Sequence, residues 1–197
     1  MHLLVLHLSN AAAATLTVGP TQLWTDVQAA IDAAAAGDTI EVEPGSYEPI
    51  VVDRPLTLVG LGGRGATTLQ ATSGLAVTVL ADTTLSGFTV HGGGGGIWVE
   101  GADFVLEHAE VSDCTGSANG GGLYAEGASV TIDDVAFRLN TAAENGGHLY
   151  AIGSTVTISG STFDAGSAHA GGGIAVASTE LAVIDSTFTG NETWGSW

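Results

Sequence analysis

Residues 121–140 have the sequence GGLYAEGASVTIDDVAFRLN, and residues 147–166 repeat it as GHLYAIGSTVTISGSTFDAG. The glycine-aliphatic element that begins each stretch recurs along the chain at steps of 26, 26 and 25 residues, and a phenylalanine marker recurs at steps of 26 and 25. A fixed period in the twenties is typical of one structural unit stacked on itself, as in a solenoid. The markers are Gly95-Gly-Ile97, Gly121-Gly-Leu123, Gly147-His-Leu149, Gly172-Gly-Ile174, Phe137, Phe163 and Phe188.

Apolar and polar residues alternate inside each repeat, as in Val130-Thr-Ile132 and Val156-Thr-Ile158. Alternation over short runs bounded by Gly, Ser, Asn and Asp predicts short strands joined by turns. Each repeat holds about three such runs, which predicts a parallel β-helix whose coils lie about 4.8 Å apart. The crossover rule favours the right-handed form. We therefore expect an all-β, right-handed parallel β-helix with three-strand coils of about 21–26 residues and roughly six coils.

Two inward ladders extend this register upstream. The first step in each is 21 residues, which predicts that one early coil is shorter than the others. One ladder contains Leu85, Leu106, Ile132, Ile158 and Val183, and the other contains Val90, Val111, Phe137, Phe163 and Phe188.

The chain is strongly acidic, with 21 acidic residues, three arginines, no lysine and a net charge of −18. This charge argues against nucleic acid and anionic membrane surfaces as partners. It also argues against tight binding of polyanions such as pectate unless cations bridge the two surfaces. The plainest interpretation is a solubilising surface. With 45% hydrophobic residues and 30 glycines at recurring turn positions, residues 15–197 are expected to form a single β-helix domain.

The N-terminal residues 1–14 have two interpretations. Leu3-Leu-Val-Leu-His-Leu8, followed by Ala11-Ala-Ala-Ala14, resembles the end of a secretory signal and favours a signal-peptide remnant. The alternative is an ordered first strand running into Thr15-Leu-Thr-Val18. No segment of the sequence has the apolar length of a membrane span. The single cysteine, Cys114, is expected to be a small buried residue at a coil corner.

A helix is predicted over about residues 25–36. Thr25-Asp26 provides the N-cap, Gly37 ends the helix, and Val27, Ala30 and Ile31 belong to its apolar face. One amphipathic helix ahead of a stack of coils is expected to cover the open apolar end of the first coil.

This helix, the Gly37-Asp-Thr-Ile40 run and the Pro44-Gly-Ser-Tyr47 run together resemble the N-terminal part of pectin-lyase-like right-handed β-helix proteins. The later Phe-x-x-Asn and Gly-Gly-aliphatic repeats resemble the polymorphic outer-membrane-protein repeats of bacterial surface proteins. The resemblance covers residues 22 to 191 and implies the fold more specifically than any activity.

The pectin-lyase-like resemblance makes a polysaccharide lyase or a glycoside hydrolase the alternative function. Lyases of this superfamily use a basic residue, but Arg138 lies over Asp164 one coil on, where an ordinary cross-strand ion pair is expected. Hydrolysis needs two carboxylates, and Asp133-Asp134 is the obvious pair, at a coil corner where turn acids are common. His148 replaces a repeat glycine and is interpreted as a turn histidine. We therefore expect no catalytic residues.

No cofactor or metal site is expected either. Acidic corners could hold calcium, but the chain lacks the regular Asp-x-Asp-Gly pattern that would support such a site.

One outward ladder stands out as a candidate ligand strip. If Ile97, Leu123 and Leu149 point inward, the residues that follow them point outward, with acids two positions further on. The rings either stack on sugar rings while the carboxylates accept hydroxyl hydrogens, or simply stack on one another to stabilise the coils. The strip consists of Trp98, Tyr124, Tyr150, Glu100 and Glu126.

No capping helix follows Phe188-Thr-Gly-Asn191, so the chain is expected to be part of a longer solenoid or to have its last coil covered by a partner. The favoured function is a non-catalytic, adhesin-like or structural protein at the bacterial outer membrane or in the extracellular space. Its expected partners are polysaccharides or another surface protein.

Overall fold

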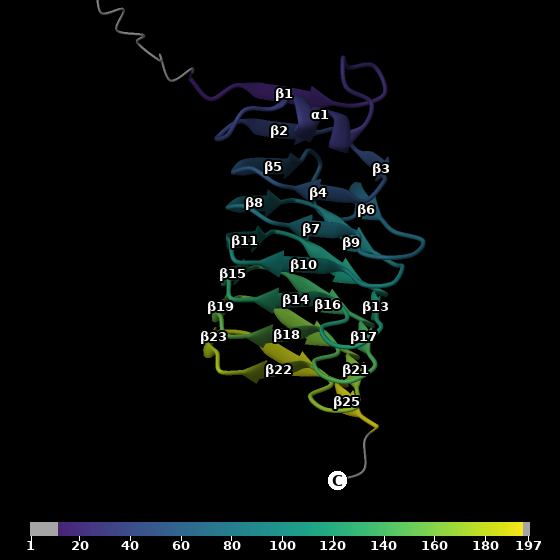
Figure 1. Cartoon of the computed structure of the whole chain (residues 1–197). Coiled ribbons are helices and arrows are strands. Elements are labelled where there is room, and N and C mark those ends of the chain that lie inside the picture. Colours follow the sequence, from purple (N-terminus) through teal and green to yellow (C-terminus); the bar gives the residue numbers. More distant parts are fainter. Residues whose placement is uncertain (1–11, 195–197) are drawn as a thin grey trace, which may run out of the picture.

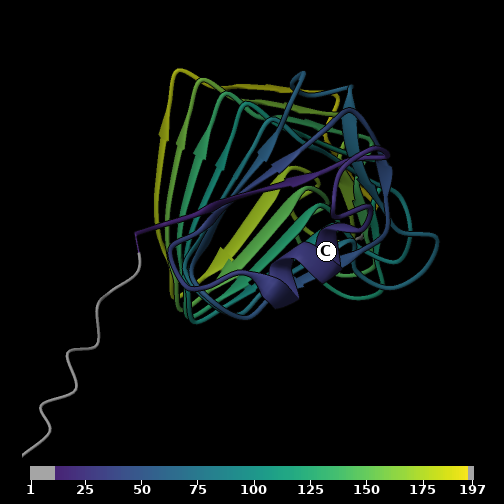
Figure 2. The same ribbon diagram turned by 90° about the horizontal axis from the view of Figure 1, so that it is seen from above.

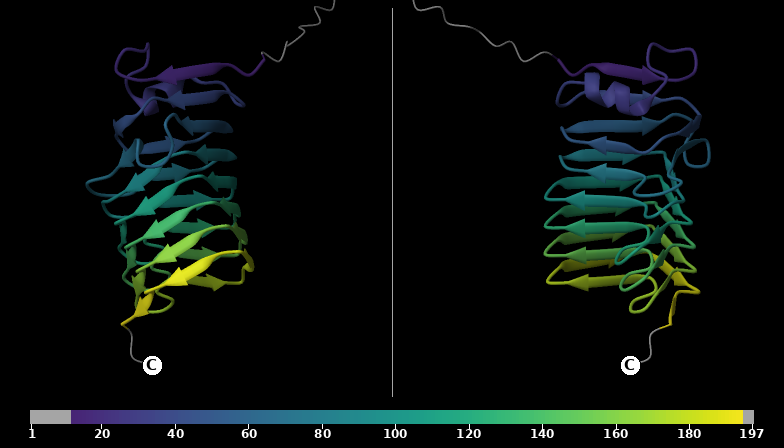
Figure 3. Two further views of the ribbon diagram at one scale, coloured as in Figure 1. Left: turned by 180° about the vertical axis from the view of Figure 1, so that it is seen from behind. Right: turned by 45° about the vertical axis from the view of Figure 1, so that its right-hand side comes forward.

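The computed structural model describes residues 12–194, which contain one α-helix and 25 β-strands wound into a parallel β-helix (Figure 1). Strands of successive coils lie one below another along a single axis, as the two views of Figure 3 also show. The stack has about 7 turns, more than the roughly six expected. The additional turn lies near the N-terminus, where the register pairs Ile40 with Leu58 and Leu58 with Leu85. Because these steps are irregular and lack the repeat markers, the first coils cannot be recognised from the repeat pattern of the sequence.

Two long sheets carry most of the core. The eight-stranded sheet has the order β1 (Thr15–Val18), β2 (Thr39–Val42), β5 (Leu56–Gly60), β8 (Thr83–Ser86), β11 (Asp103–Glu107), β15 (Ser129–Asp133), β19 (Thr155–Ser159) and β23 (Glu180–Ile184). The seven-stranded sheet has the order β3 (Gly45–Tyr47), β6 (Thr67–Gln70), β9 (Thr89–His91), β12 (Glu110–Ser112), β16 (Ala136–Arg138), β20 (Thr162–Asp164) and β24 (Thr187–Thr189).

Two further sheets complete each coil. The six-stranded sheet has the order β4 (Ile50–Val52), β7 (Val77–Val79), β10 (Ile97–Glu100), β14 (Leu123–Glu126), β18 (Leu149–Ile152) and β22 (Ile174–Ala177). The four-stranded sheet has the order β13 (Thr115–Gly116), β17 (Thr141–Ala142), β21 (Ser167–Ala168) and β25 (Glu192–Thr193). This fourth sheet was not anticipated, because its strands are only two residues long and show no alternation.

The fourth sheet begins only partway along the stack (Figure 1). His91 pairs with Ser112 and Ile97 pairs with Leu123, so the same loop contains residues 92–96 in one coil and residues 113–122 in the next. This difference explains the 21-residue step seen in the sequence: the coils before β13 are trimmed at this loop, and the later coils are not.

The interior confirms both predicted inward ladders. Val90, Val111, Phe137, Phe163 and Phe188 occupy consecutive positions of the seven-stranded sheet. The ring of Phe163 is fully buried and its centroid lies 4.7 Å from those of both neighbouring phenylalanines, with nearly parallel planes. The coil spacing and the ring spacing therefore coincide, which makes this file a continuous aromatic stack.

The first coil is capped by α1 (Val27–Ala33), whose Val27, Ala30 and Ile31 are buried against it. Figure 2 shows α1 lying across the end of the stack. Asp26 is the N-cap, and its carboxylate accepts a hydrogen bond from the backbone N–H of Ala29 at 2.8 Å. The expected end near residue 36 is wrong, because Ala34 is already extended.

Asp38 holds the chain immediately after this helix. Its two carboxylate oxygens accept hydrogen bonds from the backbone N–H groups of Ala35 at 2.8 Å and Ala14 at 2.7 Å. These bonds lower the pKa of the Asp38 carboxyl group. Residues 15–18 form β1, whereas residues 1–11, which the sequence leaves open between a signal remnant and the start of a first strand, lie outside the described residues.

The last described coil is less covered than the others. Its inward positions remain partly exposed, as shown by Val183 at 42% and Phe188 at 44%. Among residues 12–194, no helix is long and apolar enough to cross a membrane.

Candidate functional site

The predicted ligand strip is assembled on the outer face of the six-stranded sheet. Trp98 on β10 pairs with Tyr124 on β14, which pairs with Tyr150 on β18, and all three side chains are half-buried. Glu100 and Glu126 pair beside them and are exposed. The register and outward orientation are therefore confirmed, and we call these five residues the aromatic strip. Its use as a binding surface stays a prediction.

The two tyrosines of the strip stack on one another. Their ring centroids lie 5.7 Å apart at an interplanar angle of 24°. The Tyr124 hydroxyl donates a hydrogen bond to Oε2 of Glu126 at 3.1 Å. Partial burial, this bond and the neighbouring negative charge raise the pKa of Tyr124. This end of the strip is therefore held together by contacts within the protein.

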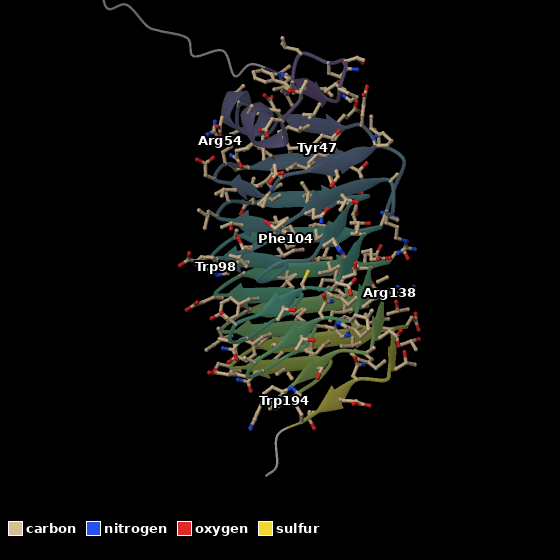
Figure 4. The ribbon with its side chains drawn as sticks, turned by 90° about the vertical axis from the view of Figure 1, so that its right-hand side faces the viewer. Tyr47, Arg54, Trp98, Phe104, Arg138 and Trp194 are labelled. Carbon is tan, nitrogen blue, oxygen red and sulfur yellow. The ribbon has the colours of Figure 1, made fainter. Side chains whose placement is uncertain are left out.

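Trp98 is placed differently. Its indole makes none of the aromatic stacking contacts found among the described residues, and it forms one wall of a hollow of about 280 Å³. Figure 4 shows Trp98 at the outer edge of the stack, on the side opposite Arg138. Besides four loop glycines, the hollow is lined by Leu75, Trp98, Ser117, Ala118, Asn119 and Tyr124.

The hollow exists because two coils of different length meet there. The loop at residues 92–96 is short and leaves one side of Trp98 uncovered, while the loop at residues 113–122 in the next coil is five residues longer. The longer loop supplies Ser117, Ala118 and Asn119 as the opposite wall. The change from a 21-residue step to a 26-residue step is the sequence signal for this hollow, but spacing alone does not show which side chains the shorter loop leaves uncovered.

A second hollow, of about 230 Å³, lies at a corner of the seven-stranded sheet and is lined by residues that include two of the three arginines. Arg64 donates from Nη1 to the backbone oxygen of Asp134 at 3.0 Å and from Nη2 to its Oδ1 at 3.2 Å. Arg138 Nε lies 3.8 Å from Oε2 of Glu110. We call this site the arginine corner.

The arginine corner corrects one expectation about Arg138. Asp164 does lie beside Arg138 in the register, but its Oδ1 accepts a hydrogen bond from Thr189, and the ionic partner of Arg138 is Glu110 in the preceding coil. The Asp133-Asp134 pair does not converge on one point either. Asp133 accepts a hydrogen bond from Ser159 at 2.6 Å, whereas Asp134 is held by Arg64.

His148 is in the loop before β18, as expected, but its side chain is fully buried inside the stack instead of lying at the surface. Its ring packs against Phe137 and Phe163, with centroids 6.0 and 5.9 Å away. Its Nδ1 accepts a hydrogen bond from Nδ2 of Asn140 at 3.0 Å, and its Nε2 has no partner among the described residues. Burial lowers the pKa of His148 to about 4.

Glycine makes room for this ring. A Cβ on Gly166 would collide with the His148 imidazole, so Gly166 is the empty position that the ring fills. In the three related coils the arrangement is reversed: Gly96, Gly122 and Gly173 leave room for the side chains of Cys114, Asn140 and Asn191. Because the two positions are far apart in sequence, this exchange was not anticipated.

Cys114 is buried at a coil corner as predicted, and burial raises the pKa of its thiol to about 12. Within residues 12–194, no three His, Cys, Asp or Glu side chains come together in a way that could hold a metal ion.

Comparison with protein families agrees with this architecture. A family described as a right-handed β-helix region matches residues 66–197. Two crystal structures of the pectin methylesterase from Aspergillus niger, in deglycosylated and penultimately deglycosylated forms, are similar to the chain. Each aligns at 13% identity and a TM-score of 0.41, covering 94% of this chain and 89% of that chain. No curated protein sequence matches.

Proposed function

Because the chain belongs to the right-handed β-helix family, we propose that it is a non-catalytic β-helix protein that binds glycans along the aromatic strip. The observation that carries the proposal is the in-register row of Trp98, Tyr124 and Tyr150 on one outer face, with Glu100 and Glu126 beside it. Aromatic rings offer flat apolar surfaces to sugar rings, and carboxylates accept hydrogen bonds from hydroxyl groups.

The proposed setting is secreted or cell-surface, with an adhesin-like or structural role. It is supported by the resemblance of the repeats to those of polymorphic outer-membrane proteins and by the signal-like residues 1–14. The net charge of −18 keeps such a surface soluble and disfavours nucleic acid as a partner. Determining the N-terminal residue of the protein isolated from its source tests the setting, since a cleaved leader leaves a new N-terminus.

Screening the purified chain on a glycan array tests the binding proposal. We expect binding to at least one glycan class, and its loss in the double variant Trp98→Ala with Tyr124→Ala while circular dichroism remains that of a folded β-protein. If every bound glycan is retained by the double variant, the strip is not the binding surface. If the variant only lowers the melting temperature, the rings serve the fold alone.

A polysaccharide lyase or glycoside hydrolase is the second candidate, and the arginine corner is the observation that favours it. Arg64, Asp134, Glu110 and Arg138 place two basic and two acidic groups around one hollow. Incubation with a panel of polysaccharides, following reducing ends and the absorbance of unsaturated products, tests this candidate. Turnover that disappears in Arg138→Ala would replace the non-catalytic proposal with an enzymatic one.

A further inference from the structure

We infer that the hollow beside Trp98 is a subsite for a single uncharged pyranose ring, with Trp98 as its stacking platform. This inference rests on the proposed glycan binding. It specifies where on the strip the sugar binds and which class of sugar is recognised. It separates the aromatic strip into two parts: Trp98 and Tyr124 line the hollow and contact the ligand, whereas Tyr150 lies outside the lining and stabilises the coils by stacking on Tyr124.

The size of the hollow indicates one ring. Sites for drug-sized ligands occupy about 300–1,000 Å³, and this hollow, at about 280 Å³, lies just below that range. One side is aromatic and the other is a loop of small residues, Gly116, Ser117 and Ala118. A flat ring inserted between them would have one face on the indole and its edge against the loop.

The loop wall is held in place before any ligand arrives. The next coil hydrogen-bonds it at three points: Glu144 N–H donates to the oxygen of Ala118 at 2.7 Å, Gly120 N–H donates to the oxygen of Asn145 at 2.9 Å, and Asn145 Nδ2 donates to Oδ1 of Asn119 at 2.8 Å. A binding wall that is already ordered loses little conformational entropy on binding.

The same contacts leave polar groups of the loop able to form hydrogen bonds with sugar hydroxyl groups. Oδ1 of Asn119 accepts the hydrogen bond from Asn145, and its amide NH2 donates none of the hydrogen bonds found among the described residues, so it can donate to a ligand. Ser117 is exposed at the rim and supplies a hydroxyl that donates or accepts. A few fixed polar groups on a largely apolar wall are typical of small-molecule sites.

Local charge excludes acidic sugars from this subsite. Among the described residues, no cationic side chain lines the hollow, and the exposed carboxylates of Glu100 and Glu126 lie two positions beyond Trp98 and Tyr124 on the same strands. Arg138, one of only three basic residues, is on the opposite side of the stack (Figure 4). A uronate or a sulfated sugar would bring a negative charge towards carboxylates without a compensating partner.

The test combines glycan selectivity with a variant that fills the hollow. Titration calorimetry would compare uncharged oligosaccharides of glucose, mannose, xylose and N-acetylglucosamine with oligogalacturonate. Ala118→Trp adds a large side chain at an exposed wall position, and Ala143→Trp adds the same bulk at an exposed position of the next loop, outside the lining. Trp98→Ala and Tyr150→Ala complete the set.

We expect binding of an uncharged oligosaccharide, weakened about tenfold or more by Trp98→Ala and by Ala118→Trp. Ala143→Trp and Tyr150→Ala should stay within about threefold of the unmodified chain, which separates the subsite from the rest of the strip. Thermal melts of all four variants confirm that each is folded at the titration temperature.

Other outcomes separate the two proposals. Binding that survives Ala118→Trp but is lost in Tyr150→Ala overturns the subsite and leaves glycan binding along the strip intact. Preferred binding of oligogalacturonate overturns the assignment of an uncharged sugar. If no oligosaccharide binds, glycan binding itself fails, and the subsite fails with it.

Discussion

The coil of residues 121–140 and the coil of residues 147–166 share the same repeat pattern, yet their interiors are filled from opposite sides. In the first, Asn140 projects inward at the corner and Gly122 leaves space for it. In the second, His148 projects inward from the loop and Gly166 leaves the space. The two coils match at one position of the outer face, where both carry a tyrosine in the same register.

This difference shows that the two coils keep the same interior volume at this place, although a different residue fills it in each coil. Each coil interior is close-packed, so two facing positions can hold one side chain between them but not two. The hydrogen bonds also differ between a coil filled by Asn140 and a coil filled by His148. Asn140 places its amide between Cys114 N–H, the oxygen of Val111 and the His148 ring, whereas the Nε2 of His148 is left unpaired.

The stack of phenylalanine rings runs through both coils, and a substitution within it has the largest expected effect on the free energy of unfolding. Phe163→Ala should reduce the free energy of unfolding by about 3–5 kcal/mol, because a buried ring is removed from between two others. Phe188→Ala is the matched control and should cost less, since that ring is 44% exposed. Urea titration measures both, and a loss below about 1 kcal/mol for Phe163→Ala would show that the file is not core.

Acid should destabilise the coil that contains His148. The His148 pKa is about 4 in the folded chain because the ring is buried, against 6.5 for an ordinary histidine. Above pH 6.5 the ring is neutral in both states. As the pH falls from 6.5 to 4, only the unfolded chain gains the proton, so up to about 3 kcal/mol of stability is lost.

Urea titrations at pH 7 and pH 4.5 check this expectation, with His148→Gln as the control that carries the same acidic surface. Asp164, whose charge opposes the pKa shift, is present in both proteins. The unmodified chain should lose more stability between the two pH values than the variant. Equal losses in the two proteins would mean that the imidazole is protonated in the folded coil.

The exchange itself is tested by a double-mutant cycle at the facing positions. Gly166→Ala should cost about 1–3 kcal/mol by overpacking, because its Cβ meets the His148 ring and the backbone oxygen of Gly172. Adding His148→Ala removes the ring but not the Gly172 oxygen. The cost of Gly166→Ala should therefore fall without vanishing, and thermal unfolding of the four proteins measures the coupling. Additive effects would show that the two positions do not share one volume.

Much of this architecture could be predicted because residues that lie one repeat apart in the sequence are in contact in neighbouring coils. Two markers at steps of 26, 26 and 25 residues were enough to place Phe163 between its neighbours and Tyr124 between Trp98 and Tyr150. What failed depends on long side chains that reach past the in-register position. Asp164 is the in-register neighbour of Arg138, yet Arg138 pairs with Glu110, which lies beside Ala136 in the preceding coil.

Neither the hollow beside Trp98 nor the buried position of His148 could be predicted from the repeat spacing alone. The 21-residue step revealed a shorter coil, but only the structure shows that the missing residues uncover one side of Trp98. The sequence predicts a turn residue at His148 because its repeat equivalents are glycines. Its ring is inside because Gly166, 18 residues later, faces it across the coil.

The smallest expected effect concerns the outer face, where the same two coils do match. Tyr150→Ala should lower stability by about 0.5–1.5 kcal/mol, because it removes the ring that stacks on Tyr124. Tyr150→Phe keeps the stacked ring and should leave the free energy of unfolding unchanged. Urea titration of both variants distinguishes ring stacking from hydroxyl contacts. If Tyr150→Phe costs as much stability as Tyr150→Ala, hydroxyl contacts and not the stacked ring hold the tyrosine pair.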